Sequence, residues 1–255
     1  MGCVTASMCA ASILSRRFAR HARVSARSAQ TVDVERAMAV TPTGKLRAAV
    51  ADDWQSAVTH PFVAALSTGT LPVSAMRAYL VQDHQFVDSF VALMGAAVAV
   101  ADTTDARMVI ARQLGLVAGE ENTYFRRSFD ALAVADDERI QPQLLPPTVS
   151  FITLMNEAAG TRDYAACLAV LTVAEWLYLD WASRAPDPLP AEPIAREWIE
   201  LHDNPEFAAW VAFLRAELDR LIPTLTPPAG DRCVRFFAEA TRLERAFFDA
   251  VHTAR

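Results

Sequence analysis

Apolar residues recur at intervals of three and four along most of the chain, and alternation of apolar with polar residues is rare. This spacing is typical of α-helices with a buried face, so we expect an all-α fold, a single multi-helix bundle. The expected helices span residues 45–66, 74–101, 103–130, 149–159, 163–185, 194–222 and 231–253. Asp102 is expected to cap the third helix, and Asn204-Pro205 to bend the sixth.

Three of these helices carry a carboxylate where the helical pattern calls for an apolar residue: Asp83, Glu175 and Glu244. Their neighbours three and four positions away share a helix face with them and are mostly apolar or aromatic, so all three acids should point into the interior. A buried carboxylate is costly unless it is paired or hydrogen-bonded. Three of them in one core therefore predict a shared polar pocket, a candidate active site. The structural alternative for a single acid is a buried salt bridge or a helix cap.

Aromatic side chains near the three acids could hold a flat ring, although aromatics at helical spacing usually belong to the core. They are Phe86, Phe151, Trp176, Tyr178, Phe247 and Phe248. His202 lies beside Trp198 and Ile199, just before the expected bend. It either faces the same cavity or is a structural histidine, and the sequence supports both interpretations equally.

A length of 255 residues with 53% hydrophobic content is ample for a core. No second zone of composition follows residue 40, so we expect one helical domain over residues 41–255. Residues 1–40 form an extension rich in Arg, Ser and Ala that we expect to be disordered. Its first 31 residues hold five arginines and no acid, which matches an organellar transit peptide. An over-extended gene start gives the same bias and is slightly favoured, so we expect a cytoplasmic protein.

Several classes of partner and cofactor do not fit the sequence. The remainder of the chain has 19 Lys and Arg against 30 Asp and Glu, which argues against a nucleic-acid partner. No run of about 18 uncharged apolar residues predicts a membrane span. The four cysteines have neither disulfide nor metal spacing, and no Glu-x-x-His pair predicts a di-metal site. Without a P-loop or a dinucleotide fingerprint, we expect no metal and no cofactor.

Two fairly specific motifs, YLVQD (79–83) and RLERAFFD (242–249), occur with several weaker segments in a fixed order. The weaker segments are HPFVAALSTGTLP (60–72), PPTVSF (146–151), AEWLYLDWA (174–182) and EWIELHDNPEF (197–207). With these motifs the chain resembles the TenA/thiaminase II family over about residues 45–254. The resemblance implies the haem-oxygenase-like helical fold, which family members use without haem.

By this resemblance, Asp83 would bind the amino group and ring nitrogen of an aminopyrimidine, Glu244 would act as acid and base, and Tyr178 would donate a hydrogen bond. Thiaminase II members carry a nucleophilic cysteine where this chain has Ala174. Cleavage of thiamin itself is therefore not expected. Phe86, Phe151 and His202 stand at positions that are tyrosines in the family.

A second branch of the family lacks the cysteine and has a glutamate followed by Tyr and Trp, a pattern that Glu175, Tyr178 and Trp181 match. Members of this branch resemble salvage enzymes that act on pyrimidine breakdown products of thiamin. The sequence therefore predicts a cofactor-free hydrolase of amino- or formylaminomethyl-pyrimidines, with Glu244 and Glu175 as the catalytic pair. Asp83, Tyr178, His202, Phe86 and Phe151 are the expected substrate-binding residues.

We expect the partner to be a small-molecule aminopyrimidine, and the chain to form a homo-oligomer, either a dimer or a tetramer. Two other functions stay open at this point. One is a non-catalytic pyrimidine-binding or regulatory protein of the same fold. The other is an oxidase like the quinone-cofactor synthesis enzymes of this fold, although the basic, histidine-rich pocket expected for an acidic quinone is absent from the sequence.

Overall fold

The structure, a computed structural model, describes residues 41–253, with the backbone alone at residues 120–122. These residues form helices and contain no β-strand, which confirms the expected all-α bundle. The helices are α2 (Pro42–Ala49), α3 (Ala51–Val58), α4 (Pro61–Thr68), α5 (Val73–Asp83), α6 (Phe86–Val100), α7 (Thr104–Leu116), η1 (Val117–Glu121), α8 (Asn122–Ala131), α9 (Asp136–Ile140), α10 (Pro146–Gly160), α11 (Tyr164–Ala182), α12 (Pro193–His202), α13 (Pro205–Leu221), η2 (Ile222–Thr224) and α14 (Pro227–Thr253).

The chain divides into a unit of residues 1–45 and a unit of residues 46–255. The helices from α3 to α14 belong to the second unit, and all that follows concerns that unit. The disorder expected for residues 1–40 lies outside the described residues.

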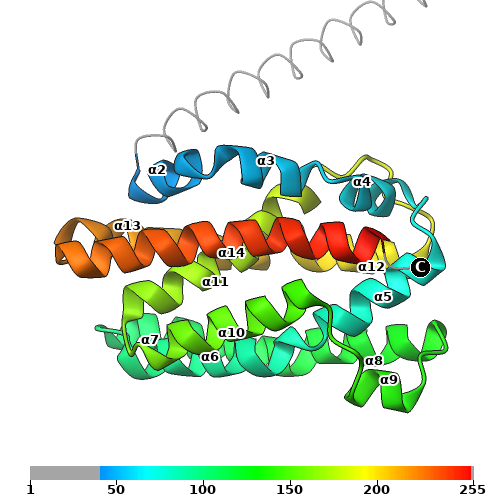
Figure 1. Ribbon diagram of the computed structural model, residues 1–255, viewed down its shortest axis with the longest axis horizontal. Helices are drawn as coiled ribbons and strands as arrows, with labels where there is room; N and C mark the ends of the chain where they lie inside the picture. Colours follow the sequence, from blue (N-terminus) through cyan, green and yellow to red (C-terminus); the bar gives the residue numbers. More distant parts are fainter. Residues whose placement is uncertain (1–40, 254–255) are drawn as a thin grey trace, which may run out of the picture. The chain divides into compact units, whose positions relative to one another are not determined.

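Helix α11 lies at the centre of the second unit. It packs against α14, α13, α6, α10 and α3, and Figure 1 shows it crossing behind α14. Sixteen of its 19 residues are buried, because apolar side chains surround it on every side. Asp163 begins the helix by accepting hydrogen bonds from the backbone N–H groups of Ala165 and Ala166. The polar side chains on its buried faces, such as Glu175 and Tyr178, are therefore held in the interior.

By length and composition alone, α11 is also a candidate membrane span among the described residues. Its most apolar window of 18 residues is 83% buried inside the protein. The core helix of a soluble protein passes the same test, so this helix is weak evidence for a membrane segment.

Two helices that the sequence predicts as continuous are broken in the structure. The stretch 45–66 contains three helices, α2, α3 and α4, and Pro61 begins the last of them because proline has no N–H to continue a preceding helix. The stretch 74–101 breaks at His84-Gln85 into α5 and α6. This second break places Asp83 at the end of one helix and Phe86 at the start of the next.

The stretch 194–222 is likewise two helices, α12 and α13, rather than one bent helix. The Asn204 side chain accepts a hydrogen bond from the N–H of Phe207 at 2.8 Å, so Asn204 caps α13, and Pro205 occupies its first turn. Helix α9 and the π-helical turn η1 were not predicted. Helices α10, α11 and α14 lie within a few residues of their expected bounds.

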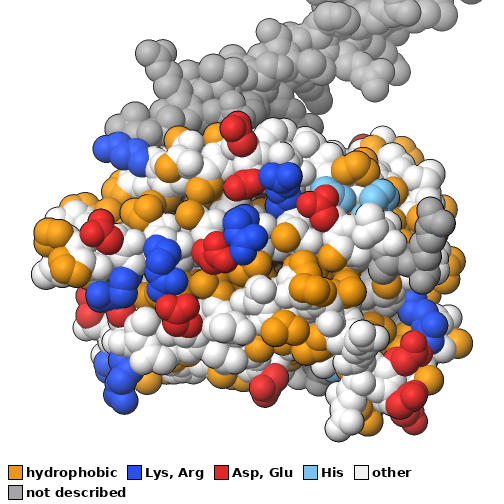
Figure 2. All heavy atoms as spheres, in the orientation of Figure 1, with side chains coloured by type: hydrophobic (Ala, Val, Ile, Leu, Met, Phe, Trp, Pro, Cys, Tyr) orange, Lys and Arg blue, Asp and Glu red, His pale blue; other side chains and the backbone are white. Residues whose placement is uncertain are grey.

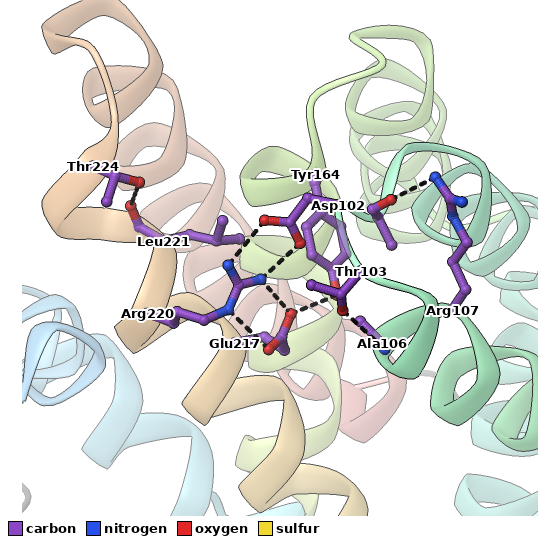
Figure 3. A network of polar contacts seen from close by, with 10 residues as sticks. Asp102, Thr103, Ala106, Arg107, Tyr164, Glu217, Arg220, Leu221 and Thr224 are labelled. Atoms are coloured by element: carbon purple, nitrogen blue, oxygen red, sulfur yellow. Dashed lines mark hydrogen bonds and ion pairs between the residues drawn. The ribbon is translucent and has the colours of Figure 1, made fainter.

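Asp102, the residue expected to cap α7, does not cap it. Thr103 caps this helix, and Asp102 instead pairs with Arg220 of α13 at 2.7 Å. Arg220 also bonds Glu217, which accepts a hydrogen bond from the hydroxyl of Tyr164 at 3.1 Å. Figure 3 shows this network, which links α13 to the start of α11 and to the residues that precede α7.

The charged residues on the face that contains α14 are mixed in sign. In Figure 2, Lys and Arg side chains alternate with Asp and Glu side chains over this face. The ion pairs made by arginines of α14 include Arg235 with Glu157, Arg242 with Glu239, and Arg245 with Asp53. Such exposed pairs contribute little to stability, and they leave no single-sign patch on this face.

Gln82 connects α5 to the segment that leads into α10. Its side-chain nitrogen donates to the carbonyl of Gln143 at 3.0 Å, and its oxygen accepts from the N–H of Leu145 at 2.9 Å and the hydroxyl of Thr148 at 2.8 Å. The side chain is buried. Because Gln82 precedes Asp83, these bonds fix the end of α5 beside α10.

We expect Gln82→Leu to lower the free energy of unfolding by about 2–4 kcal/mol. Three hydrogen bonds of about 1 kcal/mol each are lost, and their buried partners are left unpaired. Urea denaturation measures the change. Gln85→Leu is the matched control, because the Gln85 amide makes longer bonds of 3.3 and 3.2 Å and is less buried. Equal effects of the two variants would contradict a special role for Gln82.

Candidate active site

A cavity of about 160 Å³ lies among helices α5, α6, α7, α10, α11, α12, α13 and α14. A cavity of about 150 Å³ can hold one benzene molecule, so this one has room for a single six-membered ring. All seven residues expected at the site line it: Asp83, Phe86, Phe151, Glu175, Tyr178, His202 and Glu244. The fold thus gathers them from six helices, and their roles remain predictions.

Glu244 of α14 is the most enclosed acid of the cavity. It is 2% exposed, and its Oε2 atom has no hydrogen-bond partner among the described residues. Burial raises the pKa of this carboxyl well above the usual 4.5, and the nearby charges of Asp83 and Glu175 raise it further. Glu244 therefore holds its proton to a higher pH than an ordinary glutamate, as a general acid must.

Glu175 and Asp83 present the other two carboxyl groups. Glu175 of the central helix α11 is 7% exposed, whereas Asp83 at the end of α5 is only half-buried. Both lie close enough to Glu244 for their charges to act on its pKa. Carboxyl groups that share a cavity resist ionising together, so the site favours a mixed set of neutral and ionised acids.

Tyr178 also faces the cavity from α11, three residues after Glu175. Its hydroxyl lies 3.0 Å from the hydroxyl of Tyr79, which accepts a hydrogen bond from the indole N–H of Trp198 at 3.0 Å. Burial raises the pKa of both tyrosines well above the usual 10. Both hydroxyls therefore stay protonated at any pH at which the enzyme would work.

His202 at the end of α12 is neutral in this cavity. It is 8% exposed, and burial lowers its pKa to about 4. Its Nδ1 atom lies 2.8 Å from the main-chain oxygen of Trp198. A carbonyl oxygen only accepts, so Nδ1 carries the proton and Nε2 holds a lone pair. His202 thus offers a hydrogen-bond acceptor.

The aromatic side chains expected near the acids divide into three groups. Phe86 and Phe151 line the cavity and contact each other edge to face, with ring centroids 5.4 Å apart. Phe247 and Phe248 are fully buried and do not line the cavity. The ring of Phe247 packs edge to face against the ring of Phe86, with the two centroids 5.0 Å apart. Trp176 does not line it either, and packs instead under the guanidinium group of Arg215, 4.0 Å from its ring centroid.

Ala174 lines the cavity beside Glu175 and leaves no thiol there. The cysteines in the described part of the chain, Cys167 and Cys233, are buried and do not line the cavity. Burial raises the pKa of each thiol to about 12. Neither is a reactive thiolate, so the site is suited to proton transfer between carboxyl groups rather than to thiol attack.

The cavity also has lining residues that sequence reasoning missed. Helix α7 and the turn η1 contribute Gln113, Leu116 and Val117, and the start of α13 contributes Glu206 and Phe207. The sequence contains no signal for them, because they meet the acids only through the packing of α7 and α13.

The charge of the cavity lining is one-sided. It includes four carboxyl groups, those of Asp83, Glu175, Glu206 and Glu244, and none of the described lining residues is Lys or Arg. In the described part of the chain, no three His, Cys, Asp or Glu side chains are grouped so that they could hold a metal ion. These charges favour a neutral or cationic ligand over an anionic one.

We expect Glu244→Gln to stabilise the protein near neutral pH. Above about pH 4.5 the unfolded chain releases the Glu244 proton while the folded chain keeps it, so wild-type stability falls as the pH rises towards the raised pKa. Gln has no such proton. The gain should be about 1.4 kcal/mol for each pH unit in this window and should vanish below pH 4.5, as measured by denaturation at several pH values.

Glu239→Gln, on the same helix, is the control, because the pKa of Glu239 is shifted in the opposite direction to that of Glu244. Its carboxylate pairs with Arg242, and this hydrogen bond lowers the pKa of Glu239. That substitution should leave stability unchanged or lower it at neutral pH. A loss of stability in Glu244→Gln at pH 7 would show that the Glu244 carboxyl has a structural partner.

Comparison with known proteins finds one family model and one curated relative that match most of the chain. The model of the TENA/THI-4/PQQC family matches residues 47–254. The chain is 26% identical over 204 residues to the aminopyrimidine aminohydrolase of Bacillus subtilis (strain 168), which covers 79% of this chain and 86% of that protein.

Two solved structures are similar to the fold. A TenA homologue from P. horikoshii OT3 has a TM-score of 0.75 and 22% identity, over 85% of this chain and all of that one. A TenA family transcription regulator from Silicibacter sp. TM1040 has a TM-score of 0.74 and 22% identity, over 83% of this chain and 96% of that one. The helices described above therefore adopt the TenA fold.

Proposed function

The chain belongs to the TENA/THI-4/PQQC family, and we propose that it is a cofactor-free hydrolase of thiamin-derived aminopyrimidines. It would convert an aminomethyl-pyrimidine to the hydroxymethyl form, or a formylaminomethyl-pyrimidine to the aminomethyl form, for thiamin salvage. The relative in Bacillus subtilis that is called an aminopyrimidine aminohydrolase supports this proposal. The observation that carries it is Glu244, a buried acid with a raised pKa that shares one cavity with two further carboxyl groups.

Hydrogen-bonding groups of both kinds are available to an aminopyrimidine. The carboxylate of Asp83 would accept from the ring amino group, and the hydroxyl of Tyr178 would donate to an acceptor atom of the ligand. Nε2 of His202 would accept a further N–H. Phe86 and Phe151 would contact the flat ring. The cavity lining without Lys or Arg argues against an acidic quinone, and so against the oxidase alternative.

In the proposed mechanism, Glu244 is the general acid and Glu175 is the general base. Glu244, which keeps its proton, protonates the leaving amine nitrogen, while ionised Glu175 takes a proton from water. The water oxygen then forms a bond to the methylene carbon as the C–N bond breaks, which releases ammonia and the hydroxymethyl product. Return of the proton from Glu175 to Glu244 through solvent restores the starting state.

We expect Glu175→Gln and Glu244→Gln each to lower kcat by about 10²–10⁴, the usual range for a lost acid or base. The double variant should lose little more than the worse single one, because the two groups act as one unit. The wild-type rate should fall at low pH as the base is protonated and at high pH as Glu244 ionises. Steady-state kinetics across the pH range measures both limbs.

Glu206→Gln is the matched control, because Glu206 is a carboxylate of the cavity lining but is exposed. Its kcat should stay within a few-fold of wild type. Near-normal turnover by Glu175→Gln would rule out the proposed pair. Loss of the high-pH limb in Glu244→Gln would identify Glu244 as the acid.

The proposed function is tested by turnover of an aminomethyl-pyrimidine, its formyl derivative and thiamin. We expect hydrolysis of one or both pyrimidines and poor turnover of thiamin, because Ala174 places no thiol against the ring. Cys167→Ser should leave kcat unchanged. Efficient cleavage of thiamin would contradict this proposal. Calorimetric binding of the pyrimidines without turnover would favour the non-catalytic alternative. The homo-oligomeric state and the cytoplasmic location stay predictions.

A further inference from the structure

A line of buried polar groups leads from α12 through α5 to the cavity. The indole N–H of Trp198 donates to the hydroxyl oxygen of Tyr79, and this hydroxyl lies 3.0 Å from that of Tyr178. Tyr178 lines the cavity, whereas Tyr79 is 0% exposed and does not. The proposed mechanism gives Tyr79 no role, although its hydroxyl is the link between the other two residues.

The chemistry of the three groups sets the direction of these hydrogen bonds. An indole N–H only donates, so the Tyr79 oxygen is its acceptor. The Tyr79 proton then has the Tyr178 oxygen as the acceptor that the structure provides. In the reverse orientation, none of the hydrogen bonds identified in the described residues would give the Tyr79 proton an acceptor, and an unpaired buried donor is costly. Tyr178 therefore accepts from Tyr79, and its own proton is left for an acceptor at the cavity.

Both tyrosines keep their protons in this arrangement. Burial raises the pKa of Tyr79 and of Tyr178 well above 10, so neither hydroxyl loses its proton within the working pH range. A hydroxyl that accepts one hydrogen bond becomes a better donor in the next. The same Trp198 holds Nδ1 of His202 through its main-chain oxygen. One residue thus orients a donor and an acceptor of the cavity.

We propose that Tyr79 is a positioning residue: together with the Trp198 indole it locks the Tyr178 hydroxyl as a hydrogen-bond donor to the bound ligand. This inference rests on the proposed hydrolase function. A locked donor matches a lone pair of the substrate, such as a ring nitrogen or the formyl oxygen. The substrate amino group is then left to the acceptor Asp83. Tyr79 thereby fixes the orientation in which the pyrimidine enters the cavity.

Tyr79→Phe tests this role because it removes the hydroxyl and keeps the ring. The ring packs against Phe62 and Phe247, with centroids 4.8 and 5.6 Å away. We expect kcat for the aminomethyl-pyrimidine to fall about tenfold or more, the range of a donor lost from a preorganised site. In a Tyr178→Phe background, Tyr79→Phe should change kcat less than about twofold, because Tyr79 acts only through Tyr178.

Tyr164→Phe is the matched control. Tyr164 also donates a hydrogen bond from a buried ring, to Glu217 in the network of Figure 3. It lies 14 residues before Tyr178 on α11, or about 21 Å along the helix. The control should lower the melting temperature and leave kcat unchanged. The KM and kcat of all variants should be measured alongside thermal melts, so that loss of fold is separated from loss of orientation.

Each outcome bears on a different statement. If the wild type turns over a pyrimidine and folded Tyr79→Phe has normal kcat, the positioning role is wrong while the proposed function stands. Equal and additive losses in the wild-type and Tyr178→Phe backgrounds would make Tyr79 structural instead. If Tyr79→Phe does not fold, the Tyr178→Phe variant is the test. A normal kcat in Tyr178→Phe would overturn the positioning role, because Tyr79 is proposed to act only through the Tyr178 hydroxyl. A wild type that turns over no pyrimidine overturns the proposed function and this inference together.

Discussion

The site depends on one costly arrangement, a carboxyl group held away from water with an unpaired oxygen. Glu244 is buried among apolar and aromatic side chains of α14 and its neighbours, and its Oε2 atom has no partner in the described structure. An ion in this position would be strongly destabilised, so the group keeps its proton. In the proposed mechanism, the same packing keeps the proton that Glu244 gives to the leaving amine. The central helix α11 permits this, because its apolar contacts stabilise the fold around the cavity.

A neutral Glu244 changes what the other polar groups can do. The cavity then contains two fixed donors, the Glu244 carboxyl and the Tyr178 hydroxyl, and acceptors at Asp83 and His202. Trp198 orients two of the four, one through its indole N–H and Tyr79, the other through its main-chain oxygen. Groups oriented before the ligand arrives do not have to reorganise during the reaction. This preorganisation is the contribution of α12, whose short span between two breaks holds Trp198 and His202 one turn apart.

The sequence was sufficient for the all-α fold and for the placement of three acids, because helical periodicity reports which face is buried. Of the aromatic residues near the acids, Trp176, Phe247 and Phe248 belong to the core and do not line the cavity. Adjacent residues of a helix do not share a face, so a tryptophan beside Glu175 points elsewhere and packs under Arg215. The roles of Gln82 and Tyr79 were not predictable. Their partners lie 61 to 119 residues away on other helices, and such pairings leave no local pattern. The helix breaks at residues 59–60 and 84–85 were missed for a similar reason, since short breaks hardly disturb the apolar spacing.

The absence of a thiol and the presence of Glu175 are physically linked. A cysteine at position 174 would adjoin Glu175 in a cavity with Asp83 and Glu244, and none of the described lining residues is a cation. Burial, with a further contribution from the charge of Asp163, raises the pKa of Cys167 and of Cys233 to about 12. A thiol at position 174 would therefore need a group that stabilises its thiolate, and none of the described lining residues is Lys or Arg. The same surroundings suit a pair of carboxyl groups, because a raised pKa turns one of them into an acid while the other remains a base. The charges of this cavity therefore match proton transfer to and from water.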